Sequence, residues 1–115
     1  MITMYHNPRC SKSKATLELL TKKGVQPEIR LYLEDPPSVQ ELQELAGKLQ
    51  LHPTRFIRFN EEVAKQMNIA AADDRDESEW FALMSANPIL IERPVVIVED
   101  KAVIGRPPEN VLILI

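Results

Sequence analysis

Cys10 is the only cysteine of the chain, and its surroundings are those of a reactive thiol. It follows Asn7-Pro8-Arg9, which ends a short apolar run, and it precedes residues 11–23, whose apolar side chains recur with helical spacing. Cys10 is therefore expected at or just before the N-terminus of a helix. Backbone N–H groups and the positive end of the helix dipole gather there, which stabilises a thiolate and leaves room for an anion.

The charges near Cys10 also favour a thiolate. Residues 1–17 contain His6, Arg9, Lys12 and Lys14 but no Asp or Glu. A helix N-terminus and nearby cations lower a thiol pKa from about 8.5, sometimes to between roughly 3.5 and 7.5. We therefore expect Cys10 to be largely a thiolate at neutral pH. The alternative is a buried, unreactive cysteine, because a free cysteine also behaves as a small hydrophobic residue.

The residues after Cys10 exclude two other uses of such a loop. A second cysteine three residues on would make a Cys-x-x-Cys pair, but Ser13 stands there, so this chain cannot close its own disulfide. An arginine six residues on would indicate a phosphate loop of the small tyrosine phosphatase kind, but residue 16 is Thr. Any arginine that clamps an oxyanion must therefore come from distant parts of the chain.

Two Arg-Pro pairs are the best-placed candidates for that clamp. Arg93-Pro94 and Arg106-Pro107 each hold an arginine beside a rigid residue at the edge of an expected strand. Guanidinium groups pair with oxyanions in a bidentate fashion and stay charged, although ordinary loop arginines would give the same pattern. Arg55 and Arg58 fall within an expected helix, where spacing alone favours solvated side chains.

The elements that position these residues begin with a strand, a helix and a second strand. Residues 1–5 and 27–33 have strand patterns, and the helix at 11–23 joins them, with Gly24 as its C-terminal stop. Two strands joined through a helix lie parallel in one sheet with a right-handed crossover.

Helices are expected next. Ser38 with Glu41 is a capping box for a helix to about Leu51, residues 54–67 form a further helical piece, and Asp76 with Glu79 caps a helix that ends at Asn87-Pro88. After this insertion the pattern returns to strands at 95–98 and 102–104, and to a last helix buried by residues 111–115.

Composition and charge exclude several classes of protein. The chain has 115 residues, 44% of them hydrophobic, and a net charge of −3, which indicates one domain and argues against a general nucleic-acid or membrane surface. We see no stretch long enough to span a membrane and no signal peptide, and an unpaired cysteine suits a reducing compartment, so a cytoplasmic protein is expected. His6 and His52 are too far apart in the sequence to suggest a metal site.

Four motifs together resemble the glutaredoxin-linked arsenate reductases of bacteria: Tyr5-His6-Asn7-Pro8-Arg9-Cys10-Ser11-Lys12-Ser13, Leu31-Tyr32-Leu33-Glu34-Asp35-Pro36-Pro37, Asn87-Pro88-Ile89-Leu90-Ile91-Glu92-Arg93-Pro94 and Gly105-Arg106-Pro107. The resemblance covers nearly the whole chain. It implies an α/β protein of thioredoxin-like fold, with a mixed sheet flanked by helices. We expect a single domain over residues 1–115, with a helical insertion at about 36–88.

The resemblance also implies roles for individual residues. It makes Cys10 the nucleophile and His6 the histidine that activates it, and it makes Pro94 a cis proline facing the loop. Three arginines that would bind the oxyanion match Arg58, Arg93 and Arg106, of which Arg58 comes from the resemblance alone. Asn7 and Ser13 could hydrogen-bond the sulfur or the anion, or could cap the helix.

The activity implied is reduction of arsenate to arsenite. No cofactor is expected to be bound. Glutathione would supply the second thiol as co-substrate, glutaredoxin would regenerate the enzyme, and the protein would act as a monomer. Lys14 stands where some members have Arg, and the end of the chain at Ile115 places it nearer the short, chromosomally encoded branch. Two alternatives stay open: an Spx-type regulator that binds RNA polymerase, and a thiol reductase acting on another oxyanion or on a mixed disulfide.

Overall fold

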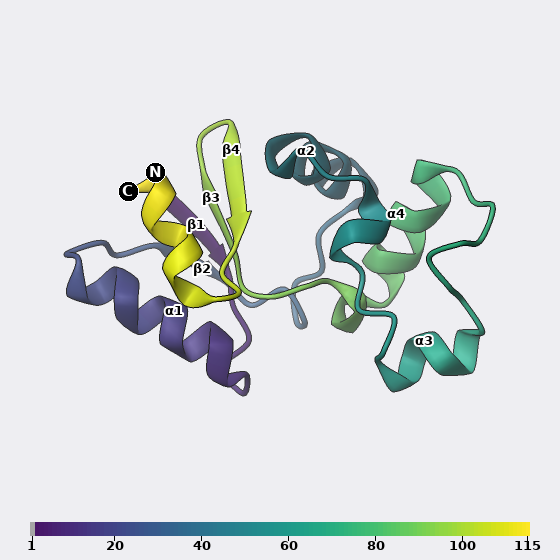
Figure 1. The fold of residues 1–115 in the computed structure, drawn as a ribbon, viewed down its shortest axis with the longest axis horizontal. Coiled ribbons are helices and arrows are strands. Elements are labelled where there is room, and N and C mark those ends of the chain that lie inside the picture. Colours follow the sequence, from purple (N-terminus) through teal and green to yellow (C-terminus); the bar gives the residue numbers. More distant parts are fainter. Residues whose placement is uncertain (1) are drawn as a thin grey trace. The chain divides into compact units, whose positions relative to one another are not determined.

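The computed structural model describes residues 2–115, and segments from its N-terminal and C-terminal parts form a four-stranded mixed sheet (Figure 1). The strand order is β2-β1-β3-β4. β1 is parallel to β2 and antiparallel to β3, and β3 is antiparallel to β4. The predicted parallel pair and the mixed sheet are therefore confirmed, while Met1 of the predicted first strand lies outside the described residues. The strands are Ile2–Tyr5, Glu28–Arg30, Val95–Val98 and Lys101–Ile104.

The chain divides into two compact units. One unit extends to Asp35 and resumes at Arg93, and it holds the sheet; the other, Pro36–Glu92, holds only helices and their connections. No helix within residues 2–115 is long and apolar enough to cross a membrane.

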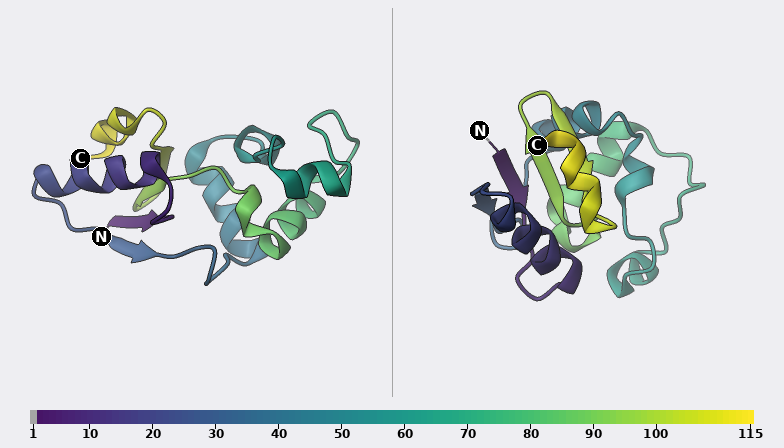
Figure 2. Two further views of the ribbon diagram at one scale, coloured as in Figure 1. Left: turned by 90° about the horizontal axis from the view of Figure 1, so that it is seen from below. Right: turned by 60° about the vertical axis from the view of Figure 1, so that its left-hand side comes forward.

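Helix α1, Ser11–Lys22, and a C-terminal 3₁₀ helix, Pro108–Leu114, lie side by side in the unit that holds the sheet (Figures 1 and 2). The fully buried side chains between sheet and helices are Met4, Leu20, Val96 and Val111. Each contributes on the order of 1.5–3 kcal/mol through burial. This packing holds α1 against the sheet, so the N-terminus of α1 lies close to the end of β1.

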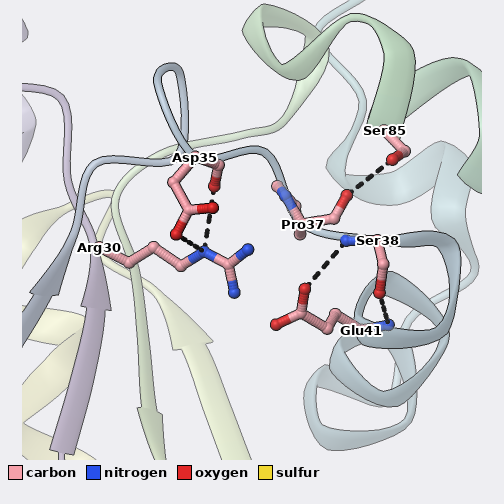
Figure 3. Close-up of polar contacts among 6 residues, drawn as sticks. All are labelled: Arg30, Asp35, Pro37, Ser38, Glu41 and Ser85. Carbon is pink, nitrogen blue, oxygen red and sulfur yellow. Dashed lines mark hydrogen bonds and ion pairs between the residues drawn. The ribbon is translucent and has the colours of Figure 1, made fainter.

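The predicted strand at 27–33 is too long. Pairing ends at Arg30, and the chain then turns, because the Leu31 carbonyl accepts hydrogen bonds from the N–H groups of Glu34 and Asp35. Tyr32 turns into the core and stacks on Tyr5, with ring centroids 6.2 Å apart. Arg30 closes the turn, since its Nε donates to the Asp35 carbonyl and pairs with the Asp35 carboxylate (Figure 3).

In the helical unit, α2 (Val39–Leu49) and α4 (Glu77–Ala86) begin at the predicted capping boxes. Ser38 Oγ accepts the Glu41 N–H, and the Glu41 carboxylate accepts the Ser38 N–H (Figure 3). Asp76 and Glu79 do the same for α4. The two helices pack against each other through buried side chains, namely Leu42, Leu45, Trp80, Phe81 and Met84.

The prediction of a single helical piece at 54–67 is wrong. This segment contains a 3₁₀ helix, Pro53–Phe56, and the short helix α3, Glu62–Met67. Ile57 between them is extended and forms an antiparallel bridge with Ile91, just after the 3₁₀ helix Pro88–Leu90. Hydrogen bonds across the bridge satisfy backbone groups that a continuous helix would have used.

The last predicted helix is a 3₁₀ helix, and its burial is only partly as expected. With three residues per turn, Val111 and Leu114 share a face, and that face packs on the sheet. Ile113 points the other way and is 79% exposed, so the prediction that it is buried is wrong.

Candidate active site

Cys10 occupies the N-cap position of α1, as predicted. Its backbone is extended, its N–H donates to the Asn7 carbonyl at 3.0 Å, and its carbonyl accepts the Lys14 N–H at 3.0 Å to begin the helix. The thiol therefore lies where the first N–H groups of the helix have no helical acceptors. The residue is partly buried.

Opposing influences act on the Cys10 pKa. Burial raises the pKa of the thiol, but the Ser13 N–H, the Arg93 guanidinium and the Lys12 N–H form hydrogen bonds with the sulfur and lower it. The Arg93 charge lowers it further, so the thiol pKa lies below its ordinary value. The site thus favours the thiolate, which is the nucleophilic form of cysteine.

Alkylation of the folded protein should therefore reach half its maximal rate at a pH below the ordinary thiol pKa of about 8.5. Because the folded pKa is below the unfolded one, the folded state binds fewer protons between the two values. Stability then rises with pH across that window and is lost as the pH falls through the folded pKa. The measurement is the pH profile of iodoacetamide alkylation, with the protein in urea as reference. Equal midpoints in the folded and unfolded protein would contradict this expectation.

His6 is buried, and its hydrogen bond goes to Ser13. The distance from His6 Nδ1 to Ser13 Oγ is 2.6 Å, and the Asn7 N–H donates to the same hydroxyl at 3.0 Å. Burial lowers the His6 pKa, and the charge of Lys14 lowers it further. A neutral imidazole is therefore favoured. Ser13 links it to Cys10, because the Ser13 hydroxyl bonds the imidazole and the Ser13 N–H interacts with the sulfur.

The side chains of Ser13 and Asn7 hold the loop in place. Ser13 is fully buried, and its hydroxyl is engaged by His6 and by the Asn7 backbone. Asn7 Oδ1 accepts the Arg9 N–H at 3.0 Å. Both side chains therefore brace the segment that presents Cys10.

Two of the three predicted arginines come together in the unit that holds Cys10. The Arg93 guanidinium forms a hydrogen bond with the Cys10 sulfur, and Arg106 Nη1 donates to the Arg93 carbonyl at 3.3 Å. The Arg93–Pro94 peptide is cis, as the resemblance implied, and the Arg106–Pro107 peptide is also cis. Arg93 and Arg106 thus form one cluster, of which Arg93 interacts with the thiol.

Gly105 and Thr16 support this cluster, although the sequence alone indicated no role for either residue. Gly105 N–H donates to the Pro94 carbonyl at 2.9 Å, and Thr16 Oγ1 bonds the carbonyls of Lys12 and Gly105. A Cβ on Gly105 would lie 2.7 Å from Thr16 Oγ1 and 2.9 Å from Pro94 Cγ. The glycine directly before Arg106-Pro107 is the only sequence feature that could have indicated such a close approach.

Gly105→Ala should destabilise the protein by about 1–3 kcal/mol, because the added methyl displaces Thr16 or the Pro94 ring. Gly47→Ala is the matched control, since a Cβ there meets nothing within 4 Å and the residue lies on α2. Alanine in that helix should stabilise by roughly 0.5–1 kcal/mol. Urea unfolding of both variants measures the difference, and equal effects at the two glycines would contradict the packing argument.

Arg58, the third predicted arginine, belongs to the helical unit. Its guanidinium pairs with Glu61 at 3.0 Å and with Glu92 at 3.7 Å. The side chain is 14% exposed, so the expectation from spacing that it is a solvated helix residue is wrong, whereas Arg55 is exposed as expected. An oxyanion at Arg58 would have to share the guanidinium with two carboxylates.

The fold and this site define a thioredoxin-like protein: a parallel β1-α1-β2 unit, a cysteine at the start of α1, and a cis proline before an antiparallel hairpin. The model of the ArsC family matches residues 5–114, and the chain belongs to that family.

Several relatives match over almost their whole length. The chain is 49% identical to a protein named arsenate reductase from Haemophilus influenzae, over 96% of both chains. It is 45% identical to the uncharacterized protein YfgD of Escherichia coli K12, over 96% of this chain and 93% of that one. Among solved structures, an arsenate reductase from Vibrio cholerae superimposes with a TM-score of 0.94 and 42% identity, covering 99% of this chain and 97% of the other.

Proposed function

We propose that the protein is an arsenate reductase that uses Cys10 as its nucleophile and draws a second thiol from glutathione. The observation that carries the proposal is the cluster at α1, where a thiol of lowered pKa interacts with Arg93, which lies next to Arg106. Membership of the ArsC family supports arsenate as the oxyanion.

In the first step the Cys10 thiolate attacks arsenic, a sulfur–arsenic bond forms, and an arsenic-bound oxygen departs as water after protonation. Negative charge on the remaining oxygens is stabilised by the guanidinium groups of Arg93 and Arg106. Arg58 is assigned to the same oxyanion through the family resemblance. The arsenic is still As(V) at this stage.

Reduction needs two electrons, which two thiols supply when they are oxidised to one disulfide. The chain has one cysteine, so the second thiol comes from outside. The glutathione thiolate attacks the Cys10 sulfur, a sulfur–sulfur bond forms, and the sulfur–arsenic bond breaks with its electron pair left on arsenic. Arsenic then leaves as arsenite, As(III), and Cys10 remains as a mixed disulfide with glutathione. Thiol exchange with glutaredoxin then restores the Cys10 thiol. Such a cycle requires the reduced thiol pool that the cytoplasm maintains.

The test is NADPH consumption by the purified protein with arsenate, glutathione, glutaredoxin and glutathione reductase. We expect turnover that depends on arsenate and on every thiol component. Turnover with a mixed disulfide or a different oxyanion, but not with arsenate, would overturn the assignment of substrate. Absence of any turnover, together with stoichiometric recovery of RNA polymerase in a pull-down, would overturn the assignment as an enzyme and support a regulator.

A further inference from the structure

A cavity of about 430 Å³ lies beside the Cys10 loop, within the unit that holds the sheet. Residues of the loop form one side of it, and the turn after β2 forms the other. Sites for small-molecule ligands have volumes of about 300–1,000 Å³, whereas a tetrahedral oxyanion needs far less. The lining residues are His6, Asn7, Pro8, Arg9, Leu31, Leu33 and Glu34.

Both sides of this groove are held by contacts already formed in the protein. The turn is fixed by the stacking of Tyr32 on Tyr5 and by the hydrogen bonds of its backbone to the Leu31 carbonyl. Arg30 bonds to Asp35 at the end of the turn (Figure 3), and the His6 N–H donates to the Arg30 carbonyl at 2.9 Å, which joins the two sides. The groove is therefore preformed, and a ligand would not have to order it.

The chemistry of the lining is amphipathic. Because Tyr32 takes the buried position of the turn, Leu31 and Leu33 point outward and are 37% and 38% exposed. Arg9 supplies a guanidinium and Glu34 a carboxylate, and neither side chain forms an ion pair with another residue within 2–115. The groove thus offers an apolar surface with one cationic and one anionic group.

We propose that this groove binds glutathione for attack at Cys10; the proposal rests on the proposed function, which requires an external thiol. Glutathione carries carboxylates at both ends, an ammonium at one end and a thiol in the middle. Arg9 pairs with a carboxylate, Glu34 pairs with the ammonium, and Leu31 with Leu33 covers the apolar part of the peptide. Arg9 directly precedes Cys10, so the groove adjoins the loop that carries the reacting sulfur.

A tripeptide fits this concave site better than a protein surface does. A stable protein interface buries about 800 Å² on each partner, over a surface much larger than one cavity. A glutaredoxin would therefore react with the mixed disulfide without filling the groove.

Binding is tested with S-methylglutathione, which cannot react, added to ¹⁵N-labelled protein. We expect amide shift changes at Arg9, Leu31, Leu33 and Glu34. Arg9→Ala and Glu34→Gln should each weaken binding about three- to tenfold, the range for charged hydrogen bonds at a partly exposed site. Arg55→Ala is the matched control, because Arg55 is an exposed arginine of the helical unit.

Kinetics provide a second readout. In Arg9→Ala the KM for glutathione should rise by the same factor, and the ratio of turnover with glutathione to turnover with 2-mercaptoethanol, which lacks charged ends, should fall. Shift changes in the groove without arsenate turnover would support the site and overturn the proposed function. Turnover with unchanged KM in both variants would overturn the site and leave the reductase. Shifts that appear only with glutaredoxin would overturn glutathione as the occupant.

Discussion

Cys10→Ser is expected to lower arsenate turnover by more than about 10³-fold, because a serine hydroxyl stays protonated and cannot be oxidised to a disulfide with glutathione. Serine is a favourable N-cap residue, so the start of α1 should be preserved. The measurement is NADPH consumption with arsenate, glutathione and glutaredoxin, with thermal unfolding of both proteins in parallel.

Unfolding separates loss of chemistry from loss of structure. An unchanged or slightly raised melting temperature with lost turnover would assign the loss to the thiol itself. Turnover within tenfold of the parent protein would contradict Cys10 as the nucleophile.

Arg93→Ala is expected to lower kcat/KM about 10²- to 10³-fold, the range found when one donor to a developing oxyanion is removed. The Arg93 guanidinium also lowers the pKa of the Cys10 thiol, so the variant should need a higher pH for alkylation by iodoacetamide. A pH series distinguishes the change in thiol pKa from the loss of oxyanion binding. Above the thiol pKa of the variant the thiolate is restored, while the deficit in oxyanion binding persists.

Arg93→Lys distinguishes the charge of Arg93 from the geometry of its guanidinium group. It keeps a positive charge and should retain much of the lowered pKa, but it loses the bidentate fork and should remain impaired with arsenate. Arg55→Ala controls for the loss of one arginine elsewhere. An alkylation profile in Arg93→Ala identical to that of the parent protein would contradict the interaction of Arg93 with the sulfur.

Elements that depend on local chemistry were predictable from the sequence. The capping boxes at Ser38 and Asp76 place the starts of two helices correctly, because the bonding partners lie three residues apart. The helix expected at 54–67 failed because Ile57 pairs with Ile91, a contact between distant residues. The strand expected at 27–33 was too long because Tyr32 is held by Tyr5 from the neighbouring strand.

In the site, too, features set by neighbouring residues were predictable and contacts between distant residues were not. The position of Cys10 at the start of α1 was predictable, since a turn followed by helical spacing defines it. The bond of His6 to Ser13 and the two carboxylates around Arg58 were not, because spacing does not show where a side chain points. The contact of Gly105 with Thr16 joins residues 89 positions apart and leaves only a glycine in the sequence.

The N-cap position of Cys10 also governs how the proposed cycle ends. The amides and guanidinium that stabilise the Cys10 thiolate act again when glutaredoxin attacks the mixed disulfide, since the sulfur expelled in that exchange is a thiolate. A thiol of low pKa departs faster and makes its disulfide more oxidising. The arrangement that makes Cys10 a nucleophile therefore also makes it a good leaving group, so one helix terminus promotes both the formation and the discharge of the covalent intermediate.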